Sequence, residues 1–332
     1  MNNFLAFISI PITLLISFIF IIVVRSLDVF ETESFKNILK AFVYGMLSTI
    51  LTLYLVSISD TIIWYSLGFS EGSPRLITTV IDAPVFEEIS KGLLLLLFIK
   101  RKKDEIDTLA DYLVYGTTIG LGFEFIENLF YITEGYGQLS FIDSWFNQLD
   151  YRLIASGGTH GFYTAWVGLG LWFIQRTSFI NKNIYFISCL FIAITLHGIN
   201  NFSAILGLTT IYNANYLLVI GMYMVLIFIS LSLDISLLTK FSMKLQEYIL
   251  LTKKGDNVDL LNLLNIYANP INHIKSRFYR LNKSLFNRDH SKFKEFSKLA
   301  FNYENKRLKK NSSDEFLIDQ AMNLLDASKG KV

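Results

Sequence analysis

The chain has 332 residues, of which 52% are hydrophobic and only 17% are charged. This composition excludes an ordinary soluble domain and favours a membrane protein. The net charge of +2 combines two unlike parts: residues 1–239 carry 12 Lys and Arg against 18 Asp and Glu, whereas residues 240–332 carry 18 against 10. We therefore predict a polytopic membrane domain over 1–239 and a basic cytoplasmic helical tail over 240–332.

Seven apolar blocks reach the roughly 20 residues that a helix needs to cross a bilayer. They are about Phe4–Val24, Ala41–Ile58, Leu76–Ile99, Leu109–Thr133, Leu153–Ile174, Asn183–Leu206 and Tyr216–Leu238. The first has no basic residue before it and no small-residue cleavage site, so we expect a retained helix rather than a signal peptide. The sequence thus predicts an all-α, multi-pass membrane protein with about seven transmembrane helices.

Lys and Arg in the connections predict the orientation, because these residues accumulate on the cytoplasmic side. Connections after odd-numbered blocks carry nine of them, at Arg25, Lys36, Lys40, residues 100–103, Arg176 and Lys182. Connections after even-numbered blocks carry only Arg75, and Arg152 lies at the edge of the fifth block. We expect the N-terminus outside and the tail in the cytoplasm, in a protein of the plasma membrane.

The tail has two segments with helical apolar spacing, Asp259–Tyr267 and Ser313–Ala327. Between them, Ile274–Lys310 mixes Lys and Arg with aromatic residues. Two interpretations stay open: a small helical domain with a solvated basic face, or a helix lying on anionic lipid, where each Lys or Arg adds about 1 kcal/mol. Nucleic acid is not an expected partner.

Polar side chains inside the apolar blocks gather in the third to the sixth block. They are Glu87, Glu88 and Lys91 in the third, Glu124, Glu127 and Asn128 in the fourth, His160 in the fifth, and His197 and Asn201 in the sixth. A charged residue at a helix centre opposes insertion into the bilayer by about 2.5–3.5 kcal/mol, and such residues usually mark functional sites. Pairing that only holds the helices together is the alternative interpretation.

The depths of these residues agree. With about 1.5 Å of rise per residue, Glu87, Glu127, His160 and His197 lie roughly 20–24 Å above the cytoplasmic ends of their helices. We therefore predict one site in the outer half of the bilayer. Lys91 follows Glu87 by four residues and Glu88 by three, so it can neutralise either carboxylate. Pro84 weakens the helix just before both glutamates.

Such a set of side chains is suited to peptide hydrolysis. A carboxylate such as Glu87 can take a proton from water and return it to a leaving amine. The amides of Asn128 and Asn201 can hydrogen-bond a developing oxyanion. If a metal is used, His160, His197 and Glu127 would hold Zn²⁺ with an open position for water. These residue types leave the choice between water alone and a metal open.

Four motifs that contain these residues also carry a resemblance. Glu87-Glu88-Ile89-Ser90-Lys91 fits the E-E-x-x-K motif of the PrsW family of intramembrane proteases, and Phe123–Asn128 fits its F-x-x-x-E-N motif. His197–Asn201 fits its H-x-x-x-D/N motif, and His160 stands where the family has another histidine. The order and spacing agree across residues 84–201, so the chain resembles this family and, through it, a superfamily that contains the CAAX prenyl proteases.

The resemblance implies site-specific cleavage of a membrane-anchored protein, of the kind that releases an anti-sigma factor. Members of the family are described both as metalloproteases and as metal-free glutamic proteases. Two departures stand out: Glu124 adds an acid where the family is apolar or small, and Asn201 replaces the aspartate, which favours an amide role there.

Two other functions compete with the protease. A non-catalytic scaffold would use the same polar cluster to grip a partner helix, as a γ-secretase subunit of that superfamily does. A proton-coupled transporter would use the glutamates and histidines as a relay, but the sequence shows no paired inverted halves. A water-filled cavity that reaches Glu87 would favour the enzyme over the scaffold.

Overall fold

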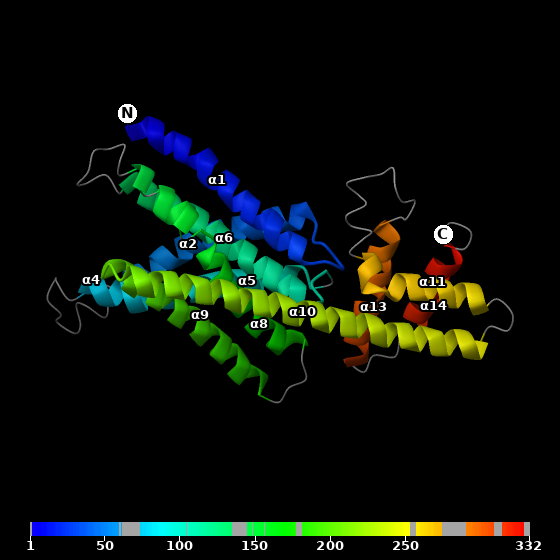
Figure 1. Cartoon of the computed structure of the whole chain (residues 1–332). Coiled ribbons are helices and arrows are strands. Elements are labelled where there is room, and N and C mark those ends of the chain that lie inside the picture. The colour runs from blue at the N-terminus through cyan, green and yellow to red at the C-terminus, as the bar shows by residue number, and fades with distance from the viewer. Residues whose placement is uncertain are drawn as a thin grey trace. The chain divides into compact units, whose positions relative to one another are not determined.

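The computed structural model describes residues 2–59, 61, 74–103, 105–134, 145–147, 149–155, 157–176, 181–252, 257–273, 290–308 and 314–328. In these ranges the regular structure is helical throughout, which confirms the all-α prediction (Figure 1). The helices are α1 (Asn2–Leu27), α2 (Phe35–Ser59), α4 (Pro74–Ile77), η2 (Thr78–Asp82), α5 (Ala83–Arg101), α6 (Leu109–Glu134), η3 (Asp150–Ala155), α8 (Thr159–Arg176), α9 (Lys182–Ile205), α10 (Thr209–Thr252), α11 (Asn257–Ala268), α13 (His290–Leu308) and α14 (Asp314–Asp326).

Within the described ranges, four helices are long and apolar enough to cross a membrane, so the chain is an integral membrane protein. The candidate spans are Phe7–Leu27, Phe35–Ser59, Lys182–Ile205 and Thr209–Leu251. The third, fourth and fifth predicted blocks are also largely helical where the structure describes them, but each contains buried ionisable side chains, and they are not among these candidate spans. The number of seven spans and the outward N-terminus stay predictions.

The chain forms two compact units. The first comprises Met1–Arg25, Glu33–Ile106 and Asp111–Leu226, and the second comprises Ser26–Thr32, Asp107–Ala110 and Ile227–Val332. The division falls inside α10, which continues as one helix 14 residues beyond Leu238, where the sequence predicted the end of the last span. Within the first unit, α5 packs against α2, α8 and α9. The assignment of a protease domain to 1–239 and of a separate tail to 240–332 stays a prediction.

The third predicted block is one continuous helical stretch with an irregular middle. The π-helical segment η2 lies between α4 and α5, and the Ala83 N–H donates to the Thr78 carbonyl, a bond across five residues. Pro84, in the first turn of α5, has no N–H and cannot take part in the ordinary ladder. The helix is therefore irregular just before the glutamates, as predicted from Pro84. The irregularity is a π-helical turn, and the helix does not end there.

The fifth predicted block is interrupted. The structure has η3 first, then a turn at Gly157 and Gly158, and a new helix, α8, that begins at Thr159. Gly158 has φ +84°, in the left-handed region that glycine adopts without a Cβ penalty. The break places His160 in the first turn of a helix, whereas the sequence predicted it inside a continuous span.

Glycines let the helices around α6 approach closely. A Cβ on Gly116 would lie 2.8 Å from the Thr164 carbonyl oxygen of α8, and one on Gly161 would lie 2.9 Å from Thr117 Cγ2. The fourth and fifth predicted blocks therefore pack closely. Gly122 lies against α2 instead, next to Phe42 and Gly45.

The second unit has its own apolar core, to which α10, α11, α13 and α14 contribute. Both predicted tail helices are present, as α11 and α14. Phe293, Phe296 and Phe301 of α13 are buried in that core, which favours the small helical domain over a helix lying on lipid. The remainder of the basic aromatic stretch, residues 274–289, lies outside the described residues.

Candidate active site

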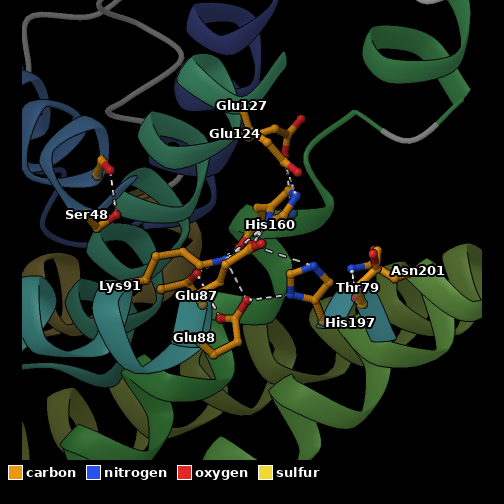
Figure 2. A network of polar contacts seen from close by, with 12 residues as sticks. Ser48, Thr79, Glu87, Glu88, Lys91, Glu124, Glu127, His160, His197 and Asn201 are labelled. Atoms are coloured by element: carbon orange, nitrogen blue, oxygen red, sulfur yellow. Dashed lines mark hydrogen bonds and ion pairs between the residues drawn. The ribbon is translucent and has the colours of Figure 1, made fainter. Parts of the chain in front are cut away.

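Side chains from α5, α6, α8 and α9 point toward one another inside the first unit (Figure 2). Glu87 Oε2 lies 3.6 Å from His160 Nδ1 and 3.7 Å from His197 Nε2. All three residues are buried, with at most 7% of their surface exposed. The common depth inferred from the sequence is thus matched by direct proximity of residues that lie as much as 110 positions apart in the chain.

A second carboxylate holds each histidine from its far side. His160 Nε2 lies 2.7 Å from Glu127 Oε2, and His197 Nδ1 lies 3.1 Å from Glu88 Oε1. A neutral imidazole has one N–H and one lone pair, and we assign the N–H to the nitrogen that has the nearer carboxylate, Glu127 for His160 and Glu88 for His197. His160 Nδ1 and His197 Nε2 therefore carry the lone pairs, and both of these atoms face Glu87.

The three atoms fit a metal ion. Around a tetrahedral ion with bonds of about 2.0–2.1 Å, neighbouring ligand atoms are about 3.4 Å apart. The two distances to Glu87 Oε2 are close to this value, and each residue offers one ligand atom within 4.8 Å of the others. Carboxylates behind both histidines are the usual supports of metal-bound imidazoles. The sequence proposed Glu127 as a ligand, whereas here Glu87 lies between the rings and Glu127 supports His160.

Lys91 supplies positive charge beside this group. Its Nζ lies 2.6 Å from Glu88 Oε1, 3.7 Å from Glu87 Oε2 and 3.1 Å from His160 Nδ1. It also lies 4.4 Å from the centroid of the Phe123 ring, a cation–π distance. The predicted pairing of Lys91 with both glutamates is present, and the ammonium competes with any bound ion for the same acidic groups.

Glu124 caps the helix that carries His160. Its Oε1 accepts the Gly158 N–H at 2.8 Å, and its Oε2 accepts the His160 N–H at 3.2 Å. The first N–H groups of a helix have no partner within the helix, and a carboxylate there also complements the helix dipole. Glu124 therefore positions His160 through the backbone, a role that the sequence left unassigned.

Two features of α9 join it to the π-helical segment. Asn201 Nδ2 donates to the Thr79 carbonyl at 3.0 Å, and a Cβ on Gly198 would lie 2.8 Å from the Val80 carbonyl oxygen. Asn201 thus braces η2 and does not point its amide at Glu87. Asn128, the residue after Glu127, is buried on α6. The sequence grouped both asparagines with the reacting groups.

Arg152 is a member of the site that sequence reasoning did not select. Its Nη2 lies 3.4 Å from Glu127 Oε1, and its guanidinium carbon lies 3.6 Å from the centroid of the Tyr131 ring. Its position at the edge of the fifth block, on the side expected to face outward, was the available clue. The contact leaves Glu127 between an arginine and a histidine.

A cavity of about 370 Å³ reaches two of these acids. Its lining is Thr49, Thr52, Leu53, Glu87, Phe123, Glu127, Phe130 and Tyr131. The cavity is lined mainly by α2 and α6, with Glu87 from α5, and it is partly open. Glu87 and Glu127 can therefore meet a molecule that enters from outside the helix bundle.

Comparison with known proteins gives one match. Residues 33–231 match the model of a family described as PrsW family intramembrane metalloproteases. The matched range contains α2 to α9, and so every helix that contributes to the cluster. Neither the curated proteins nor the solved structures gave a match to this chain.

Proposed function

Because this chain belongs to the PrsW family of intramembrane metalloproteases, we propose that it hydrolyses a peptide bond of a membrane-anchored protein within the bilayer. The family makes the chain a membrane protease. The finer proposal concerns where the reaction takes place, which residues carry it and what is cut. The substrate we propose is a single-span regulator, such as a membrane-anchored anti-sigma factor, as the family resemblance implies.

The observation that carries the proposal is the cavity that reaches Glu87 and Glu127. Hydrolysis needs a place where water and a peptide bond meet a carboxylate and its histidine partners. A scaffold that only grips a partner helix needs a closed, fully paired network instead. Buried charges inside a membrane protein that also line an accessible cavity favour catalysis.

The residues divide into three roles. Glu87, His160 and His197 form the reacting group, and Glu127, which lines the cavity, orients the attacking water and receives its proton. The proton then passes to the leaving amine as the C–N bond breaks. Glu88 and Lys91 balance the charge of the group, and the Arg152 guanidinium stabilises the carboxylate form of Glu127. We propose Asn201 as a brace of η2 rather than as an oxyanion donor, and the oxyanion role of Asn128 stays a prediction.

We propose Zn²⁺ as the metal, held by Glu87 Oε2, His160 Nδ1 and His197 Nε2. A two-histidine, one-carboxylate set with an open position is typical of zinc proteases, where the ion polarises water and the scissile carbonyl. The support is the lone pairs that both imidazoles direct toward Glu87. Metal analysis of the purified protein should find about one Zn²⁺ per chain, and His160→Ala or His197→Ala should remove it.

The test of the function is cleavage of a co-expressed single-span substrate. Glu87→Gln and His197→Ala should abolish cleavage while the protein still accumulates in the membrane. Glu247→Gln removes an exposed carboxylate far along α10 and should leave cleavage unchanged. Undiminished cleavage by both site variants would refute the assignment. Full activity of metal-free protein would refute the zinc proposal alone, and Glu87 would then act directly on water.

A further inference from the structure

The cavity that reaches Glu87 and Glu127 forms a groove between α2 and α6, and its lining combines apolar and polar side chains. Leu53, Phe130 and Tyr131 form its rim, and between 45% and 60% of the surface of each is exposed. The rest of the lining includes the less exposed Thr52, Glu87 and Glu127. An entering molecule thus meets an apolar rim and, inside it, one hydroxyl and two carboxylates.

The hydroxyl of Thr52 is unusual among the neighbouring threonines. Thr49 and Thr118 donate theirs to backbone carbonyls of their own helices, Met46 at 2.6 Å and Val114 at 2.7 Å. Thr52 is 6% exposed, and its Oγ1 has no hydrogen-bond partner among the described residues. A buried hydroxyl without a partner is unfavourable, so its presence in the wall of a cavity indicates a partner that arrives with a ligand.

A substrate that is cleaved inside the bilayer needs hydrogen-bond partners of this kind. A transmembrane helix satisfies all its backbone groups internally, and its peptide bonds are shielded. Attack by water requires that the helix open locally, which frees N–H and C=O groups in a medium with few partners. The enzyme must replace at least some of these hydrogen bonds next to the reacting carboxylates.

We propose that the groove between α2 and α6 receives the locally unwound membrane segment of the substrate, and that Thr52 Oγ1 donates a hydrogen bond to a freed backbone carbonyl next to the scissile bond. The inference rests on the proposed protease function and deepens it. The apolar rim fits the side chains of a membrane segment, and the contact to backbone makes Thr52 a positioning residue that is indifferent to the substrate's side chains.

Thr52→Val tests the proposal, because valine keeps the shape and removes the hydroxyl. One hydrogen bond of this kind corresponds to roughly a 3- to 10-fold change, so we expect kcat/KM for a single-span substrate to fall by roughly that factor. Thr52→Ser retains a hydroxyl and should restore cleavage. Thr118→Val is the matched control, since it removes a buried hydroxyl that is already bonded within α6, and it should leave kcat/KM unchanged.

A second measurement locates the substrate. A photo-crosslinking residue at Leu53, in a Glu87→Gln background that keeps the substrate intact, should capture the membrane segment of the substrate. The same residue at Leu217, which is 68% exposed on α10, should not capture it. Thermal stability and metal content of Thr52→Val should match those of the parent, which separates positioning from a folding defect.

The outcomes distinguish the groove from the function itself. If Glu87→Gln still cleaves, the proposed function fails, whatever Thr52 does. If Glu87→Gln is inactive but Thr52→Val cleaves as well as Thr118→Val, the function stands and the groove proposal is overturned. Capture at Leu217 with none at Leu53 would likewise place substrate entry elsewhere.

Discussion

Lys91 shows how single residues keep charge inside this bundle. Its side chain and that of Glu88 are both fully buried, and the two atoms that pair are 2.6 Å apart. Removing one partner from a buried pair leaves an uncompensated charge, which destabilises a protein by about 3–5 kcal/mol. The Lys91 ammonium is therefore expected to be needed for folding as well as for chemistry.

Lys91→Met should accordingly lower the free energy of unfolding by about 3–5 kcal/mol, measured by denaturation in detergent. The double variant Glu88→Gln/Lys91→Met should be more stable than the single one, because both charges are gone. Lys102→Met removes a lysine of the same i, i+3 spacing from an exposed pair with Glu105, where the loss should be under about 1 kcal/mol. Equal losses at Lys91 and Lys102 would contradict this account.

Glu124 is the second residue whose role the structure specifies. Glu124→Ala leaves the N–H groups of Gly158 and His160 without their acceptor, which should destabilise the protein by about 1–3 kcal/mol. Cleavage should fall too, because His160 lies in the turn that Glu124 caps. Glu124→Gln keeps one acceptor oxygen and should be intermediate in both measurements. A Glu124→Ala protein with parental melting temperature and activity would rule out the capping role.

At the level of elements, the site depends on how closely α9 lies against the π-helical segment η2. Gly198 lies against the Val80 carbonyl, and Asn201 bonds the Thr79 carbonyl three residues further along the helix. This contact sets the distance of His197 from Glu87 and Glu88. The third and sixth predicted blocks are therefore joined by contacts to backbone carbonyls of η2, and the sequence of either block by itself does not reveal these contacts.

Gly198→Ala should therefore impair cleavage strongly. The new Cβ would lie 2.8 Å from the Val80 carbonyl oxygen, so α9 must shift and take His197 with it. Displacements near 1 Å lower rates by about 100-fold, and we expect a 10- to 100-fold loss in kcat/KM. Gly221→Ala on α10 is the control, since nothing lies within 4 Å of its Cβ and alanine favours a helix. A fully active Gly198→Ala protein would show that α9 can adapt.

At the level of the whole molecule, the orientation in the membrane is the testable prediction. Nine Lys and Arg in alternate connections favour an N-terminus outside and a C-terminus in the cytoplasm. A reporter active only in the cytoplasm should therefore be active when fused after Val332 and inactive when fused before Met1. The opposite pattern would refute the orientation, and activity at both ends or at neither would refute the odd number of spans.

Much of the site could be predicted from the sequence because its signals are local. Glu87, Glu88 and Lys91 share a helix face by spacing alone, and the apolar blocks limit the depth of His160 and His197. Block lengths likewise predicted the helices. Local signals did not reveal the turn before α8, because a glycine in the left-handed region does not alter hydrophobic periodicity. They also missed the full length of α10, because the helix continues past the end of the apolar block.

The sequence by itself determined that this is a helical membrane protein with glutamates, histidines and a lysine gathered at one level, because apolar length and helical phase are properties of each segment alone. Only the tertiary structure decided which side of each imidazole faces Glu87, that Glu124 caps α8, and that Thr52 is left without a partner. These outcomes depend on where helices cross, and the crossings are set by contacts such as Gly116 with Thr164 and Gly198 with Val80. Such contacts join distant parts of the chain, so no segment specifies them alone.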